Sequence, residues 1–221
     1  MTNAELWQRM LPLASGAAVS PLLLLGQLAL LTTLGSRAAA LRRSLAYLLG
    51  STGVVLVWTL AAGWIARRLP LHQRGADPVA AAVQLLLALA LVALVLQALL
   101  RPAPAAAPKQ PIKTGLWAPL SQGAGLMAIN LTSLVLFLPA AQDVGRSGLP
   151  WDDQLAAWIG LDLITLLPIW LPPLLVLLSG QTGAQLLERL GHWVVAHRRA
   201  IDAAVAAGFA LLLAVRGLQD L

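Results

Sequence analysis

The chain has 221 residues, of which 59% are hydrophobic and only 11% are charged, and its formal net charge is +6. Soluble domains carry about 25% charged residues, so this composition excludes an ordinary soluble enzyme or binding domain. The basic residues lie in short clusters between long apolar runs and not on one polar module, which argues against nucleic acid as a partner. Cysteine is absent, which excludes disulfides and cysteine-based metal or redox sites.

Apolar segments of about 20 residues follow one another along the chain, each long enough to cross roughly 30 Å of hydrocarbon. We predict six transmembrane helices, over Leu11–Leu34, Ser44–Ala66, Pro78–Leu100, Leu116–Ala141, Gln154–Ser179 and Ala200–Leu218. The first is not a cleavable signal, because its apolar run is too long and its basic cluster follows it. The expected fold class is all-α, a polytopic membrane protein.

A proline-rich segment, residues 102–115 with the sequence PAPAAAPKQPIKTG, divides the chain. Prolines keep such a segment extended and semi-rigid, so we interpret it as a cytoplasmic linker between residues 1–101 and 116–221. Each part holds three predicted spans, and three is odd, so the second part must enter the membrane with the opposite polarity. Topology alone therefore predicts two inverted three-helix repeats, since no strong sequence identity between the halves is visible.

The loops predict the orientation of the chain. Loops 35–43, 101–115 and 180–199 hold nine basic residues and one acid, whereas the other side holds six of each. The positive-inside rule then predicts a protein of the bacterial inner membrane with these three loops in the cytoplasm and both termini outside. The loop at 67–77, with three arginines, runs against this trend.

The last cytoplasmic loop contains an amphipathic pattern over about 182–197. Leu186, Leu190 and Trp193 recur at helical spacing, with polar residues mostly opposite, which predicts a helix lying on the membrane interface. We interpret its two histidines as surface residues of this helix and expect no metal site and no cofactor. Asp202 follows Arg198 by four residues, which predicts a local ion pair.

Both ends of the chain resemble a known family. The first part reads AVSPLLLLGQLALLTTLGSRAAALRRSLAYLLGSTGVVLVWTL, and the last part reads LLPIWLPPLLVLLSGQTGAQLLERLGHWVVAHRRAIDAAVAAGFALLLAVRGLQDL. These stretches are similar to the peptidoglycolipid addressing proteins (GAP family), in a Ser-Pro within the first span, a basic loop, a proline-containing fifth span and a final Gly-Leu. The resemblance implies the LysE-type exporter superfamily, with six spans in two inverted halves, and export of an envelope glycolipid or a small molecule.

One departure from the family pattern lies in the fourth span. Relatives often carry Asn-Pro-Lys there, whereas this chain reads AINLTSL. Asn130 is kept and the proline and lysine are not, which puts in doubt any mechanism that needs that lysine.

Polar residues recur at one depth of the predicted membrane. Asp162 lies eleven residues inward from Trp151, or roughly 16 Å, and Ser20 and Asn130 reach a similar depth in the first and fourth spans. Pro21 should free a backbone carbonyl and open the first helix. We hypothesise that Asp162, Asn130, Ser20 and Pro21 form a substrate or proton pathway.

The energetic cost of Asp162 favours this hypothesis. An Asp at the centre of a transmembrane helix costs about 2.5–3.5 kcal/mol on insertion scales. The alternative is that Asp162 bridges helices by hydrogen bonds, and Ser20 and Asn130 could likewise serve as interhelical glue. Pro168, Pro172 and Pro173 are expected to shape the fifth helix and not to touch a ligand, while Gln27, Gln84 and Gln97 do not rank above packing residues.

No P-loop, HExxH or GxSxG motif is present, so we do not expect an enzyme. Two functions stay open at this point. The first is a transporter or exporter with a polar site near the membrane midplane, proton coupling being one way to drive it. The second is a non-transporting scaffold or accessory subunit of an envelope-lipid assembly. Membrane lipids and a lipid or small-molecule substrate are the expected partners, together with either a second copy of the chain or the envelope-lipid machinery.

Overall fold

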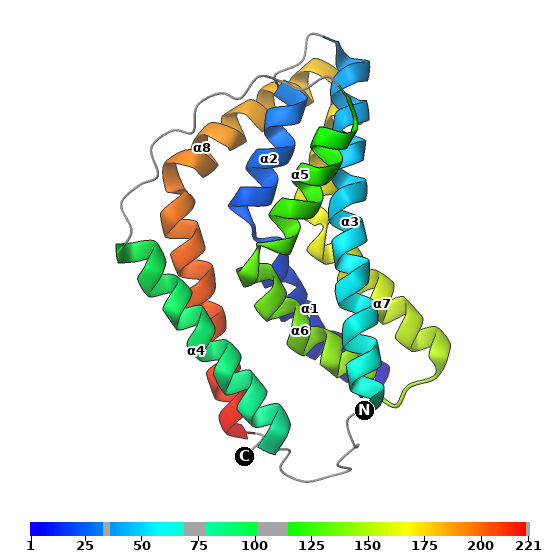
Figure 1. The fold of residues 1–221 in the computed structure, drawn as a ribbon, viewed down its shortest axis with the longest axis vertical. Coiled ribbons are helices and arrows are strands. Elements are labelled where there is room, and N and C mark those ends of the chain that lie inside the picture. The colour runs from blue at the N-terminus through cyan, green and yellow to red at the C-terminus, as the bar shows by residue number, and fades with distance from the viewer. Residues whose placement is uncertain (33–35, 69–77, 101–114, 220–221) are drawn as a thin grey trace.

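The computed structural model describes residues 1–32, 36–68, 78–100 and 115–219. The regular structure in these ranges is entirely helical, which confirms the predicted all-α class (Figure 1). The helices are α1 (Asn3–Ala18), α2 (Pro21–Thr32), α3 (Arg37–Arg68), α4 (Pro78–Leu100), α5 (Trp117–Ala128), α6 (Leu131–Gly145), α7 (Trp151–Thr165) and α8 (Leu167–Gln219). Apart from Gly115, the predicted linker lies outside the described residues.

Three of the predicted spans are bent near their middle. The bend between α1 and α2 is 54°, that between α5 and α6 is 67°, and that between α7 and the first part of α8, Leu167–Gly180, is 71°. Among the described residues, Arg37–Ile65 of α3 is an unbroken helix long and apolar enough to cross a membrane, and each bent pair meets the same criterion when taken as one span. The chain is therefore an integral membrane protein.

Local sequence explains where these helices begin. The first helix starts at Asn3, earlier than the predicted Leu11, because Thr2 and Glu5 form a reciprocal capping box at its amino end. The fifth span starts at Trp151, and Asp152 and Asp153 in its first turn complement the positive end of the helix dipole. Helix α4 has the bounds that the sequence predicts.

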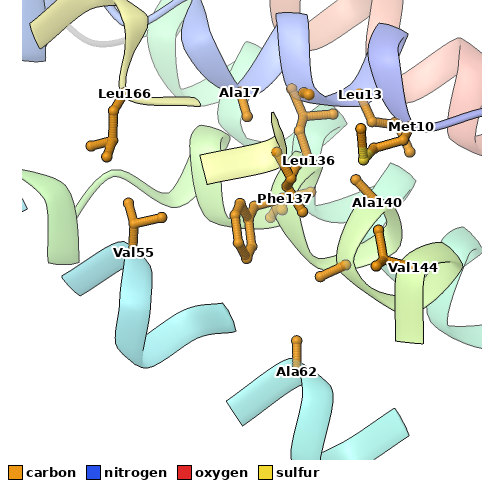
Figure 2. Close-up of a cluster of buried hydrophobic side chains, with 14 of the residues drawn as sticks. Met10, Leu13, Ala17, Val55, Ala62, Leu136, Phe137, Ala140, Val144 and Leu166 are labelled. Carbon is orange, nitrogen blue, oxygen red and sulfur yellow. The ribbon is translucent and has the colours of Figure 1, made fainter. Parts of the chain in front are cut away.

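The buried core lies where α1 and α6 cross α3 and α7 (Figure 2). Leu136 and Phe137 of α6 are fully buried there, together with Met10 and Leu13 of α1. The Trp58 ring of α3 packs against Phe137 with ring centroids 5.7 Å apart. This cluster holds α1 against α6. It therefore sets the position of the two breaks next to it, the one that ends α1 and the one that begins α6.

Helices α3 and α5 approach each other closely through glycines. A Cβ on Gly50 would meet the backbone carbonyl oxygen of Leu120, and a Cβ on Gly123 would meet that of Tyr47. The hydroxyl of Ser51 donates a hydrogen bond of 3.1 Å to the carbonyl of Gly123. Small residues and side-chain hydrogen bonds are the usual means by which membrane helices associate, so this contact holds α5 firmly on α3.

Helix α8 divides at Gly180, whose φ of 58° and ψ of −126° interrupt the helix. The interruption exposes carbonyls in the preceding turn, and the guanidinium of Arg37 donates hydrogen bonds to two of them, those of Val176 and Leu177. Arg37 thus ties the start of α3 to the fifth span.

Beyond Gly180 the helical backbone continues to Gln219, so no helix end separates residues 182–197 from the predicted sixth span. Figure 1 shows the orange part of α8 slanting outward before the red part descends beside α4. The predicted pair between Arg198 and Asp202 is present, at 3.7 Å. The interfacial position of 182–197 stays a prediction.

Candidate functional site

The breaks in the first and fourth spans have the same backbone geometry. Val19 has φ −78° and ψ 85°, and Asn130 has φ −79° and ψ 76°, both close to the inverse γ-turn. In each turn an amide N–H donates to the carbonyl two residues earlier at 2.9 Å, from Ser20 to Ala18 and from Leu131 to Ile129. The same tight turn therefore bends the helix axis in both halves of the chain, by 54° in the first and 67° in the second.

A polar residue caps the helix that follows each turn. The Ser20 hydroxyl oxygen accepts from the backbone N–H of Leu23 at 3.4 Å, at the start of α2. The Asn130 carbonyl oxygen Oδ1 accepts from the N–H of Ser133 at 3.4 Å, at the start of α6. Serine and asparagine are favoured at this position because their side-chain oxygens replace a missing helical acceptor.

The two caps contact each other in the interior. The Asn130 side-chain amide Nδ2 donates to the Ser20 hydroxyl at 2.8 Å and to the Ser133 hydroxyl at 2.7 Å. Ser20 is only 6% exposed and Asn130 9%. The structure therefore brings together two of the predicted site residues, which are 110 positions apart in the sequence, and places the amino ends of two half-helices side by side.

The break in the first span accounts for a third contact of this cluster. Helix α1 ends at Ala18, so the carbonyl of Ala17 has no donor within that helix, and Pro21, at the first position of α2, has no N–H to offer. The hydroxyl of Ser133 donates to the Ala17 carbonyl at 2.6 Å. A side chain from the second half thus satisfies a backbone group that the helix break exposes in the first half. Ser133 is buried and belongs to the site, although the sequence did not single it out.

Asp162 lies on α7, apart from the Ser20–Asn130 contact. Its carboxylate oxygen Oδ1 accepts a hydrogen bond of 2.7 Å from the Thr59 hydroxyl of α3. Within the described ranges its side-chain hydrogen bond is to Thr59, and none links it to Ser20 or Asn130. Asp162 is half-buried, so its carboxylate keeps access to the outside of the helix core. The shared cavity that the sequence suggested for all three residues is therefore not formed by direct contact.

The third break lies at Leu166, one turn after Asp162. Pro168 stands in the first turn of α8, where a missing N–H costs nothing, so it marks the start of this helix. The indole N–H of Trp170 donates to the Leu163 carbonyl at 2.9 Å, across the bend. Pro172 and Pro173 lie inside α8 and not at the bend.

Pro173 has its own partner in the first half of the chain. It leaves the carbonyl of Ile169 without a helical donor, and the side-chain amide of Gln27 on α2 donates to that carbonyl at 2.8 Å. The same amide reaches the hydroxyl of Ser44 on α3. Gln27 is fully buried and its hydrogen bonds join α2 to α3 and α8, a structural role that the sequence did not single out. Pro173 is the signal that could have found it. A proline inside an apolar helix leaves one carbonyl without a donor, and that carbonyl needs a polar side chain from another helix.

The polar atoms of this region are amides, hydroxyls, backbone groups and one carboxylate. Within the described chain, no three His, Asp or Glu side chains gather closely enough to hold a metal ion. The arrangement can bind hydrogen-bonding groups, and the converging amino ends of α2 and α6 favour negative charge. The carboxylate of Asp162 adds a group that can take up a proton.

Comparison with known proteins places the chain among lipid-addressing proteins. A family model described as SfLAP, Sap, sulfolipid-1-addressing protein, matches residues 10–219. The match confirms the resemblance to the peptidoglycolipid addressing and LysE-related proteins that both ends of the sequence indicated. No curated protein and no solved structure matches the chain.

Proposed function

This chain belongs to the family of Sap, the sulfolipid-1-addressing protein, and from that membership we propose that it exports an envelope lipid or a small amphipathic molecule across the inner membrane. Family membership implies a role in the addressing or transport of an envelope lipid. The family is a lipid-addressing and transport family, not a known enzyme family. The finer proposal concerns the site and its mechanism.

The observation that carries the proposal is the hydrogen bond between Asn130 and Ser20. It joins two broken helices at their polar caps, inside a protein that exposes many large hydrophobic side chains. Transporters build their substrate sites from discontinuous helices near the middle of the membrane, because unwound backbone and half-helix ends supply polar groups there. In our proposal the substrate competes for these polar groups as it passes.

The two breaks also support an inverted repeat. The turn between α1 and α2 matches the turn between α5 and α6, and α1 packs on α6 while α2 packs on α5. Such reciprocal contacts are expected when a twofold axis in the membrane plane passes between Ser20 and Asn130. We propose that residues 1–101 and 116–221 are the two repeats and that they rock about this axis.

The orientation of the chain follows in the same proposal. The amino terminus and the last turns of α8 lie at one end of the molecule, and the start of α3 lies at the other (Figure 1). The segment before Gly180 lies beside the start of α3, because Arg37 donates to the carbonyls of Val176 and Leu177. The excess of basic residues in loops 35–43, 101–115 and 180–199 supports a cytoplasmic position for that second end. Export would then move substrate toward the end that holds the termini.

The substrate class is an amphipathic molecule with an anionic or hydrogen-bonding headgroup. The family name refers to a sulfolipid, and a sulfate group fits helix amino ends because these carry partial positive charge. The site contains no lysine or arginine in its hydrogen-bond network, so the headgroup would be held weakly enough to leave again.

Lipid translocation in proteoliposomes tests this proposal. A sulfated glycolipid with a fluorescent label is placed in both leaflets, and an impermeant quencher reports the fraction that reaches the outer leaflet. Asn130→Ala removes the link to Ser20 and the cap of α6 together, and we expect translocation to fall about tenfold or more. Ser51→Ala, which removes a buried hydrogen bond far from the breaks, is the matched control and should translocate like the wild type.

The same assay separates the transporter from the scaffold. A scaffold would leave the labelled lipid in its starting leaflet whether or not Asn130 is intact, and the wild-type protein would then equal empty liposomes. Equal translocation by wild type and Asn130→Ala would contradict the site while leaving transport intact. A neutral glycolipid that moves as fast as the sulfated one would contradict the preference for an anionic headgroup.

A further inference from the structure

A basic groove lies between the first turns of α3 and the start of α5. Its volume is about 240 Å³, and its lining includes Ser36, Arg42 and Arg43 on one side and Gly115 and Leu116 on the other. The described residues that line it include no Asp or Glu. The start of α3, which carries most of this lining, lies at the end of the molecule opposite the amino terminus (Figure 1).

The two arginines of the groove carry unneutralised charge. In the part of the chain that the structure describes, neither Arg42 nor Arg43 has a hydrogen bond or an ion pair, whereas the neighbouring Arg37 is engaged with the carbonyls of Val176 and Leu177. Arg42 is exposed and Arg43 is half-buried. Both side chains line the groove, so two positive charges lie at its wall with no carboxylate among the described lining residues.

The backbone adds to the positive potential of this groove. Helix α5 begins beside the arginines, and its cap residue Leu116 makes no side-chain hydrogen bond to the first turn. The N–H groups at a helix start carry partial positive charge, and no carboxylate of α5 offsets it there. The adjacent start of α3 contains no acidic residue in its first turn.

Packing holds the two sides of the groove in a fixed relation. Below it, Gly50 and Gly123 bring the α3 and α5 backbones into direct contact, and Ser51 is hydrogen-bonded to Gly123. These contacts lie within two or three turns of Arg43 and Leu116. The groove is therefore preformed, which lowers the entropic cost of binding a ligand.

We propose that this groove binds the phosphate or sulfate group of an anionic membrane lipid. Guanidinium groups form bidentate, charge-assisted hydrogen bonds with such tetrahedral oxyanions. Basic pockets between transmembrane helices at the cytoplasmic surface are suited to lipid headgroups, since the acyl chains can lie along the exposed apolar faces of the same helices. Leu45 and Leu49 of α3, 52% and 65% exposed, continue from the groove along α3 and provide such a face.

Binding to the purified full-length protein in neutral detergent tests this inference without any transport assay. The probes are tail-labelled phosphatidic acid, a tail-labelled sulfated glycolipid and tail-labelled phosphatidylcholine, followed by fluorescence anisotropy. We expect both anionic lipids to bind more tightly than phosphatidylcholine. Arg42→Gln and Arg43→Gln should each weaken the anionic lipids about tenfold, the loss expected for one charged hydrogen bond.

Arg189→Gln is the matched control, because Arg189 is an exposed arginine of α8 and its loss changes the net charge by the same amount. A similar loss of affinity in Arg189→Gln would show that bulk charge, and not the groove, attracts the lipid, and would overturn the inference. Unchanged affinity in Arg42→Gln and Arg43→Gln would overturn it as well. If either glutamine variant fails to fold, Arg42→Lys and Arg43→Lys keep the charge and should still weaken binding, because lysine lacks the bidentate fork.

Inorganic phosphate and sulfate distinguish the two sources of the anion. Millimolar concentrations of either ion should leave the labelled lipid bound, because the acyl chains contribute to lipid affinity. If phosphate or sulfate displaces the labelled lipid at a concentration equal to that of the lipid, the groove is a site for a soluble anion and the lipid proposal is wrong. The outcome is independent of the proposed export function, since a lipid can bind here whether or not the protein transports.

Discussion

Gln27 on α2 donates a hydrogen bond of 2.8 Å to the backbone carbonyl of Ile169 on α8, the carbonyl that Pro173 deprives of its helical partner. Ser133 satisfies the carbonyl of Ala17 in the opposite direction, and that carbonyl lacks a helical donor because α1 ends at Ala18. Each half of the chain therefore satisfies a backbone carbonyl that has no helical donor in the other half. In hydrocarbon an unsatisfied carbonyl costs several kcal/mol, so these side chains stabilise the broken helices.

Replacing Gln27 tests the first of these contacts. Gln27→Leu removes the donor and leaves a buried carbonyl without a partner, so we expect the free energy of unfolding to fall by about 1–3 kcal/mol. Thermal unfolding of the purified protein in detergent measures the change. Gln122→Leu, on the exposed face of α5, is the control and should stay within about 0.5 kcal/mol of the wild type.

A second substitution shows whether the Ile169 carbonyl is the cause. Pro173→Ala restores a backbone N–H that can bond to this carbonyl within the helix, so Gln27→Leu should cost less in that background than in the wild type. A cost that is the same in both backgrounds would mean that Gln27 stabilises the protein through Ser44 or through packing alone.

The contact between Ser133 and Ala17 predicts a matching pair of variants. Ser133→Ala should lower the free energy of unfolding by about 1–3 kcal/mol, because the Ala17 carbonyl then has no donor. In a Pro21→Ala background the penalty should persist, because residue 21 begins α2 beyond the turn at Val19 and its N–H does not reach the Ala17 carbonyl. Thermal unfolding of the purified protein in detergent measures both variants.

The sequence predicted much of the broken first span, but not what repairs it. Pro21 beside Ser20 indicated a freed carbonyl at mid-membrane depth, because the effect of proline on the preceding turn is local. The donor, Ser133, lies more than a hundred residues away, and only tertiary packing decides which of many serines reaches that carbonyl. Asn130 was recognised from its depth in the predicted fourth span, which matches that of Ser20 in the first.

The fifth span shows the opposite case. Three prolines predicted a deformed helix, and the helix is bent by 71°, but the bend lies at Leu166 and not at Pro172 or Pro173. Pro173 is tolerated inside α8 because Gln27 supplies the donor that the preceding turn lacks. Sequence alone does not predict such compensation, since it depends on which helix packs opposite the proline.

The close contact between α3 and α5 makes a separate prediction. Gly50→Ala would place a methyl group against the backbone carbonyl of Leu120, which cannot move aside cheaply, so we expect destabilisation of about 1–3 kcal/mol. Gly53→Ala, on the same helix, meets open space and should be neutral or slightly stabilising, since alanine favours the helix. Equal effects of the two substitutions on thermal unfolding would contradict the close packing.

The carboxylate of Asp162 is the one ionisable group of the substrate or proton pathway that the sequence predicts. Asp162→Asn keeps the shape and the hydrogen bond from Thr59 but cannot ionise. We expect the variant to express and unfold like the wild type, because burying an amide costs less than burying a carboxylate. Translocation of the labelled lipid should fall about tenfold, and the remaining rate should no longer change with pH, whereas the wild-type rate should.

Thr59 separates a proton-transfer role of Asp162 from a purely structural one. Thr59→Val removes the hydroxyl that holds the carboxylate, so it should destabilise the protein by about 1–3 kcal/mol while the pH dependence of translocation persists, because Asp162 still ionises. Thr59→Ser keeps the donor and should behave like the wild type. If Asp162→Asn retains the wild-type rate and pH profile while Asp162→Leu unfolds, the carboxylate only bridges α7 to α3, and proton coupling through Asp162 is wrong.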